Sequence, residues 1–149
     1  MADIKNEVQS IRDYVGPALA GVKFHLQSMP TTYAANELSI RFAGSSTESE
    51  TGYHYRLDRI YQLVYFGASE LDCLAKMQTL EQKFNNDQVI PLKGSECHMR
   101  LEPFSISAPF KTESNIYAII GMLNASLREA RTQEVYPPII NVEITKEDE

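Results

Sequence analysis

Residues 53–84 read YHYRLDRIYQLVYFGASELDCLAKMQTLEQKF, and this stretch decides the fold. The first part, from Tyr53 to Phe66, alternates its side chains in the period of two that a strand requires. Ser69 follows, with Asp72 three residues later in place of the usual glutamate of a capping box. The pattern therefore predicts one unusually long strand that leads directly into a capped amphipathic helix.

The two halves of the predicted strand differ in their environment. One face is apolar or aromatic along most of its length, whereas the other becomes apolar only from Ile60 onward. We therefore expect an exposed arm that enters a sheet covered on both faces. The first face comprises Tyr53, Tyr55, Leu57, Tyr61, Leu63 and Tyr65. The buried stripe expected for the following helix comprises Leu71, Leu74, Ala75, Met77, Leu80 and Phe84.

The N-terminal third predicts one helix and two strands. Asp3 can cap a helix whose apolar residues recur with helical spacing up to Val15, and Gly16-Pro17 ends it. Alternation at 22–27 and again at 37–42 predicts short strands. The stretch from Gly44 to Gly52, GSSTESETG, has no apolar residue, so we expect a flexible hairpin tip there.

The C-terminal half predicts further strands. Residues 89–92 and 97–107 fit strands, with Pro103 indicating an edge or a bulge in the second. Residues 115–131 fit a helix and a buried strand equally well, because periodicity does not separate the two in a run that is apolar on both faces. Residues 139–144 alternate as a final strand, and 145–149 form an acidic tail.

The composition is that of one folded domain. With 149 residues, 43% of them hydrophobic and 23% charged, the chain can bury an independent core. We expect a single α+β domain over residues 1–144. Its sheet would be mixed, mainly antiparallel and packed against two amphipathic helices, with an extended β-hairpin arm. No apolar run is long enough to cross a bilayer and the N-terminus does not resemble a signal peptide, so we expect a cytoplasmic site of synthesis.

The net charge of −6 argues against a protein that grips nucleic acid. Lys and Arg supply most of the affinity for phosphates, and the sequence has no basic stripe. Negative charge would suit a protein that lets DNA pass without holding it.

No pattern in the sequence predicts catalysis, a metal site or a cofactor. His25, His54 and His98 each stand alone on a predicted strand, without the short regular spacing of metal ligands. Cys73 and Cys97 fit neither a zinc pair nor a redox pair, and we expect reduced, partly buried thiols. Phosphate-binding glycine loops and nucleophile elbows are absent. We therefore expect a protein that is not an enzyme and has no cofactor.

The tyrosines are the most distinctive chemical feature, with eight tyrosines and no tryptophan. Tyrosine next to arginine is favoured at protein interfaces, although a cross-strand aromatic ladder within one subunit explains the pattern equally well. The candidate contacts to a sister subunit or another protein are Glu48, Glu50, Tyr53, Tyr55, Arg56, Arg59 and Tyr136.

The stretch quoted above resembles the tail terminator proteins of long-tailed bacteriophages of Gram-positive hosts and related prophages. Tyr55, Arg56, Ile60, Tyr65 and Phe66 occupy the comparable places in that family's strand, which is likewise followed by an acidic cap and an amphipathic helix. The resemblance covers about residues 37–144 and is strongest over 53–84.

The resemblance implies a small α+β subunit that forms a hexameric ring in the virion, after assembly in the host cytoplasm. Such a ring terminates the tail tube, contacts the tube protein and a neck or head-completion protein, and lets DNA pass through. It also implies that residues 115–130 form a strand. Two alternatives remain open at this point: a neck or tail-completion protein, and a small ligand-binding or enzymatic domain.

Overall fold

The computed structural model describes residues 3–28, 34–93, 97–112 and 115–130. Its elements, in chain order, are α1 Ile4–Val15, the 3-10 turn η1 Gly16–Ala18, β1 Lys23–Leu26, β2 Glu37–Ser49, β3 His54–Gly67, α2 Glu70–Asp87, β4 Val89–Pro91, β5 His98–Ile106, β6 Phe110–Lys111 and β7 Tyr117–Ala130.

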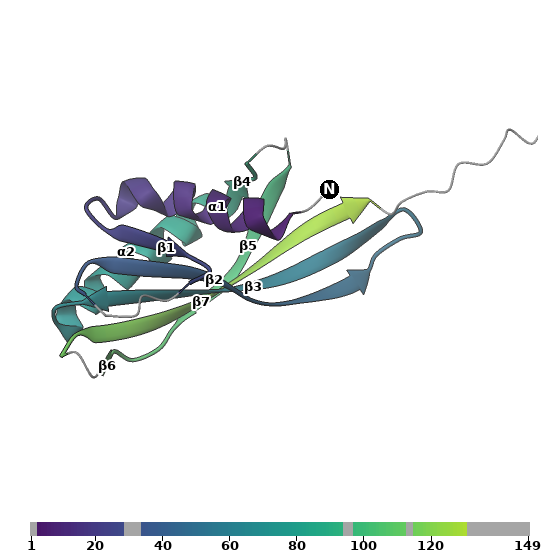
Figure 1. Ribbon diagram of the computed structural model, residues 1–149. Coiled ribbons are helices and arrows are strands. Elements are labelled where there is room, and N and C mark those ends of the chain that lie inside the picture. The colour runs from purple at the N-terminus through teal and green to yellow at the C-terminus, as the bar shows by residue number, and fades with distance from the viewer. Residues whose placement is uncertain (1–2, 29–33, 94–96, 113–114, 131–149) are drawn as a thin grey trace, which may run out of the picture.

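The described strands form one mixed sheet in the order β1-β2-β3-β7-β5-β4, with β6 paired to β7 (Figure 1). Only β1 and β2 pair in parallel, and the other pairs are antiparallel. The sheet is strongly twisted, and its β5–β4 end approaches α1. The α+β class, the mixed sheet and the two helices are as expected from the sequence.

Both helices begin where their capping residues predict. The Asp3 carboxylate accepts a hydrogen bond from the Lys5 amide, and the Ser69 hydroxyl accepts one from the Asp72 amide. Helix α2 ends at Asp87, and the next residue, Gln88, forms the C-cap with a left-handed backbone conformation.

The main core lies between the helices and one face of the sheet. The face of β3 that carries Tyr61, Leu63 and Tyr65 is fully buried there, as predicted. On the opposite face, Val64 and Phe66 form a second, smaller cluster with Ala118. The end of β3 that leads into α2 is thus covered on both faces, which confirms the expectation from its two-sided apolar pattern.

Of the helix and the strand that the sequence left open for residues 115–131, the structure has the strand. Tyr117–Ala130 forms β7 and pairs with β3 along its whole length. Gly121 permits this packing. A Cβ atom built there would lie 2.6 Å from Cζ of Phe104, so the aromatic ring occupies the space that a side chain would need. The expected irregularity at Pro103 is confirmed by a register shift between Leu101 and Phe104.

Two expectations about the strands and helices are wrong. Residues 44–49 belong to β2 and pair with β3 from Gly44–Ile60 to Ser49–Tyr55, so most of the expected loop is a strand. In α2, Leu71, Leu74 and Ala75 are exposed, and Cys73 is buried instead. The helix presents Cys73, Met77, Leu80 and Phe84 to the core, which is a narrower stripe displaced from the expected one.

The predicted final strand at 139–144 and the acidic tail lie outside the described residues. In the part of the chain that the structure describes, neither helix is long and apolar enough to span a membrane.

Candidate protein-protein interface

Three strands continue past the helices and form a projecting arm (Figure 1). The arm comprises Gly44–Ser49 of β2, His54–Ile60 of β3 and Asn124–Ala130 of β7, with β3 in the middle. The register shift between Phe42 and Gly44 adds one residue to β2. From Gly44 onward this strand carries small polar and acidic residues and no apolar alternation. The arm is therefore a three-stranded ribbon, which β5 joins at its base through Arg100 and Leu101, and not the flexible hairpin that was expected.

The outer edge of β2 is only partly covered. β1 pairs with residues 37–40, and the Gln27 side-chain oxygen then accepts a hydrogen bond from the Phe42 amide at 2.7 Å. Among the described strands, none pairs with the outer edge of Gly44–Glu48. An open strand edge of this kind is a ready site for a further strand.

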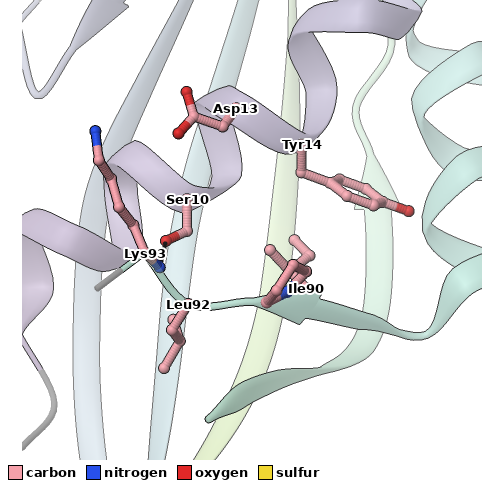
Figure 2. Close-up of a pocket in the computed structure, with 7 residues that line it drawn as sticks. Ser10, Asp13, Tyr14, Ile90, Leu92 and Lys93 are labelled. Carbon is pink, nitrogen blue, oxygen red and sulfur yellow. Dashed lines mark hydrogen bonds between the residues drawn. The ribbon is translucent and has the colours of Figure 1, made fainter. Parts of the chain in front are cut away.

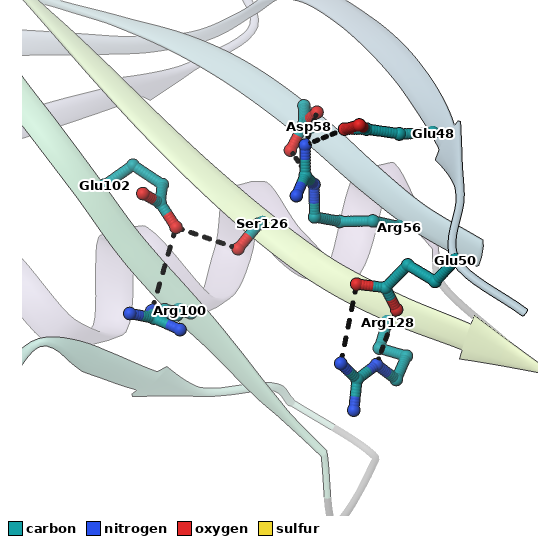
Figure 3. A network of polar contacts seen from close by, with 8 residues as sticks. All are labelled: Glu48, Glu50, Arg56, Asp58, Arg100, Glu102, Ser126 and Arg128. Carbon is teal, nitrogen blue, oxygen red and sulfur yellow. Dashed lines mark hydrogen bonds and ion pairs between the residues drawn. The ribbon is translucent and has the colours of Figure 1, made fainter. Parts of the chain in front are cut away.

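The helix-free face of the arm carries alternating charges (Figure 3). Arg56 donates to Asp58 at 3.0 Å and to Glu48, and Arg128 donates to Glu50 at 2.7 Å. A third group joins β5 and β7, in which Glu102 accepts from the Ser126 hydroxyl at 3.1 Å and lies 3.8 Å from Arg100. Exposed pairs contribute little to stability, so this face is better suited to specifying a contact than to holding the fold.

These contacts change the acidity of the groups involved. The hydrogen bond from Arg128, followed by the attraction of the nearby cations, lowers the pKa of Glu50 below its ordinary value. The hydrogen bond to Asp58 is the main cause that raises the pKa of Arg56. Both groups are consequently charged at neutral pH, and this face of the arm keeps its charge pattern.

The tip of the arm presents one large aromatic side chain. Tyr53 is 69% exposed. The Thr51 hydroxyl accepts hydrogen bonds from the Tyr53 and His54 amides, each at 3.0 Å, and so orders the turn that carries the ring. A tyrosine held in this way offers apolar area at a low entropic cost, which is a property of interface anchors.

The base of the arm is fixed to α1 by a buried ion pair. Arg59 Nε donates to Glu7 at 3.0 Å, and the Tyr61 hydroxyl donates to the same carboxylate. Arg59 also donates to the Ser45 hydroxyl at 2.6 Å, which connects the arm segments of β2 and β3 to the helix. Burial, together with the hydrogen bond to Glu7, raises the pKa of Tyr61.

The structure separates the candidate contact residues into three groups. Glu48, Glu50, Tyr53 and Arg56 lie together on the distal arm. Tyr55 is half-buried against the core and Arg59 is buried beneath α1, so these two serve the fold of the subunit. Tyr136 lies outside the described residues.

Sequence reasoning missed Asp58, Arg128 and Glu7. The first two complete the charge pattern across the arm. Arg128 pairs with Glu50, 78 residues away, and left no local signal, whereas Asp58 lies two residues from Arg56 on the same strand face and could have been found from this spacing. Glu7 could have been recognised from the sequence, because it is an acidic residue on the apolar face of α1, between Ile4 and Val8. A charge in that position requires a buried partner.

Two hollows flank α1. One, of about 430 Å³, lies between α1 and β4 and is lined by residues that include Ser10, Tyr14 and Lys93 (Figure 2). Its polar groups join the two elements: the Ser10 hydroxyl accepts from the Lys93 amide at 2.7 Å, and the Tyr14 hydroxyl contacts the end of α2. Burial and the neighbouring Asp87 raise the pKa of Tyr14, so it stays protonated.

The second hollow, also of about 430 Å³, is a groove on the other side of α1. Its walls are mainly apolar and come from the first two turns of the helix and from the strands beneath. The residues that line this groove are Ile4, Lys5, Val8, Gln9, Leu26, Gln27 and Phe42.

The histidines and cysteines do not converge. His25 Nε2 lies 3.0 Å from the Glu37 carboxylate on the next strand. Cys73 is buried, with a pKa raised mainly by burial, whereas Cys97 is exposed and not partly buried as expected. Within the described ranges, no group of three His, Cys, Asp or Glu side chains could hold a metal ion.

Comparison with known proteins finds similarity in structure only. One solved structure, whose title gives no functional description, superposes with a TM-score of 0.54 at 14% identity, over 93% of this chain and 100% of the other. A chain in a structure titled "Virion of native gene transfer agent (GTA) particle" gives a TM-score of 0.48 at 14% identity, over 81% and 90% of the two chains. No protein-family model and no curated protein matches. The first similarity shows a shared fold, and the second is too weak to carry an argument.

Proposed function

We propose that the chain is a structural subunit of a virion, and that its copies form a ring which terminates a phage tail tube and joins the tail to the head. The observation that carries the proposal is the projecting arm, whose open β2 edge, exposed Tyr53 and charged face are all displayed away from the subunit's own core. The resemblance of residues 53–84 to tail terminator proteins supports the same function.

An arm at one end of a subunit favours head-to-tail association. In such an association, the arm of one copy contacts a different surface on the next copy. Heterologous contacts of this kind close into a ring when the rotation between neighbouring copies permits closure. A strand edge such as Gly44–Glu48 gains hydrogen bonds when a neighbour covers it. Six copies, as in the family it resembles, would meet these requirements with one kind of contact.

The charge of the chain suits passage of DNA through such a ring. Six copies at a net charge of −6 each carry a total of −36. A lumen that displays part of this charge repels phosphates, so the duplex slides through without being held.

The test is the mass and shape of the purified full-length chain, alone and with the tube protein of the same phage or prophage. Analytical ultracentrifugation and negative-stain microscopy should reveal a six-fold ring, at the latest when tube protein is present. A chain that stays monomeric in both samples contradicts the proposal. Rings that bind the connector protein in a pull-down, and leave tube protein unbound, would reassign the chain to the neck.

A further inference from the structure

We propose that Tyr53 at the tip of the arm inserts into the groove between α1 and the β1–β2 strands of a second copy of this chain. The inference deepens the proposed function, on which it rests, by naming the two surfaces that meet in the ring. It follows from the chemistry of the groove, the chemistry of the tip and the distance between them within one chain.

The groove has the chemistry of a receptor for one aromatic side chain. Ile4 and Leu26 stand at its rim with 37% and 36% of their surface exposed, and Val8 and Phe42 contribute further apolar wall. Its volume of about 430 Å³ falls within the range of pockets that enclose small ligands, so a phenol ring fits. Exposed apolar surface of this kind gains stability when it is covered.

The arm also carries a charge that complements a charge beside the groove. Lys5 is exposed on the groove wall and makes no ion pair with any described residue. Near the end of the arm lies Glu48, which pairs with Arg56 through one carboxylate oxygen but whose side chain remains 57% exposed. An exposed carboxylate near the end of the arm therefore complements the ammonium group of Lys5 beside the apolar groove, and this favours the arm of another copy over an uncharged apolar segment.

The tip does not reach the groove of its own chain. Phe42 pairs with Tyr61, seven residues along β3 from His54, and this corresponds to roughly 23 Å of strand. Pairing with both β2 and β7 holds the arm extended along that length. The occupant consequently comes from a different copy, in a heterologous contact that leaves one tip and one groove free until a ring closes.

A tip seated in a groove buries less surface than a stable two-chain interface needs. We therefore expect pairs of copies to be weak and closed rings to be strong, because each subunit in a ring both gives and receives a tip. Assembly should then be steeply dependent on concentration.

The first test compares variants at the tip and at the groove in sedimentation of the full-length chain. Tyr53→Ala and Leu26→Arg should each shift ring assembly to at least about tenfold higher concentration, whereas Tyr53→Phe should assemble normally. Leu71→Arg is the matched control for Leu26→Arg, because Leu71 is 78% exposed on α2, away from the groove. Unfolding curves would verify that all four variants are folded.

The second test is disulfide cross-linking between two different chains, both with Cys97→Ser to remove the exposed thiol. One carries Gly52→Cys, where an added side chain meets open space beside Tyr53, and the other carries Gln9→Cys on the groove. The mixture should form the mixed disulfide at least about tenfold faster than a mixture of Gly52→Cys with Leu71→Cys.

The outcomes separate this inference from the proposed function. If the unmodified chain forms no ring, the proposed function fails. If rings form and both Tyr53→Ala and Leu26→Arg assemble normally without the mixed disulfide, the ring stands and the inference is overturned. Loss of assembly for Leu26→Arg alone would assign the groove to another segment, such as residues 131–149, and also overturns it.

Discussion

Glu7 on α1 and Arg59 on β3 form an ion pair of 3.0 Å, with only 1% and 9% of their side chains exposed. The pair lies at the point where the arm leaves the helices, and Arg59 extends it to Ser45 on β2. The Tyr61 hydroxyl provides a further hydrogen bond to the same carboxylate. A buried charge pair therefore sets the direction of the arm relative to the body of the subunit.

Glu7→Ala should destabilise the subunit by about 3–5 kcal/mol, because it leaves the Arg59 guanidinium buried without its partner. Replacing both residues, as in Glu7→Leu with Arg59→Leu, should recover most of this loss, since the charge that remains unpaired is then also removed. Urea unfolding of the monomeric chain measures both changes.

Arg128→Ala serves as the comparison, because it removes an exposed ion pair on the same arm and should cost less than about 1 kcal/mol. If the Arg59 side chain moved into solvent in Glu7→Ala, then Glu7→Ala and Arg128→Ala would lower the free energy of unfolding by similar amounts. Equal losses would show that α1 does not anchor the arm.

Tyr61 should make stability sensitive to alkaline pH. Burial, followed by the hydrogen bond to Glu7, raises its pKa above the ordinary 10.0, so the fold favours the protonated phenol. This contribution is fully present below pH 10.0 and is lost as pH rises through the higher pKa of the folded state. The free energy of unfolding should fall above about pH 10, and Tyr61→Phe should show a smaller fall.

Tyrosinate absorbance offers an independent reading of the same effect. Tyr61 should ionise only when the chain unfolds, and Tyr61→Phe should remove one late-ionising group without altering the early ones. If all tyrosines ionise together near their ordinary pKa while the chain is folded, the assignment of Tyr61 as a buried donor to Glu7 is wrong.

Local signals in the sequence were sufficient for the helices and for the proximal sheet. Asp3 and Ser69 mark helix starts because their side chains bond the first free amides, an interaction within three residues along the chain. Tyr61, Leu63 and Tyr65 reveal a buried strand face by alternation alone. The strand at 117–130 required the family resemblance, because its apolar run has no single period.

The distal arm was harder to predict because its pairing is not local. Residues 44–49 carry no apolar pattern, because this part of β2 lies past the helices and neither of its faces has to be apolar. These residues form a strand because they pair with β3, which the local sequence does not reveal. Arg59 was predicted to contact a sister subunit or another protein, because its partner Glu7 lies 52 residues away and leaves no signal near it. Leu71 and Leu74 fit a helical stripe, but α2 directs Cys73 and Met77 to the core in their place.

Gly121→Ala should destabilise the chain by about 1–3 kcal/mol, because the added methyl would lie 2.6 Å from Phe104 and 3.3 Å from the sulfur of Met77. The ring or the strand must then shift. Gly44→Ala is the matched control, since it lies in a strand of the same sheet and its added methyl meets nothing within 4 Å. The control should leave stability unchanged within about 0.5 kcal/mol. A Gly121→Ala variant as stable as the control would mean that Phe104 does not pack over this glycine.

Glu50→Gln should weaken the arm in a way that depends on pH. The hydrogen bond from Arg128 lowers the pKa of Glu50 below 4.5, so its contribution to stability is present above that pH and is lost as pH falls through the lower value of the folded state. The difference in unfolding midpoint between the parent chain and Glu50→Gln should be largest near neutral pH, shrink below about pH 4.5, and decrease with added salt, because the pair is exposed. In an Arg128→Gln background the same substitution should have little effect at any pH, since the cation that lowers the Glu50 pKa is gone. A pH dependence that persists without Arg128 would mean that another group controls Glu50, and the charged face of the arm would then have to be reassigned.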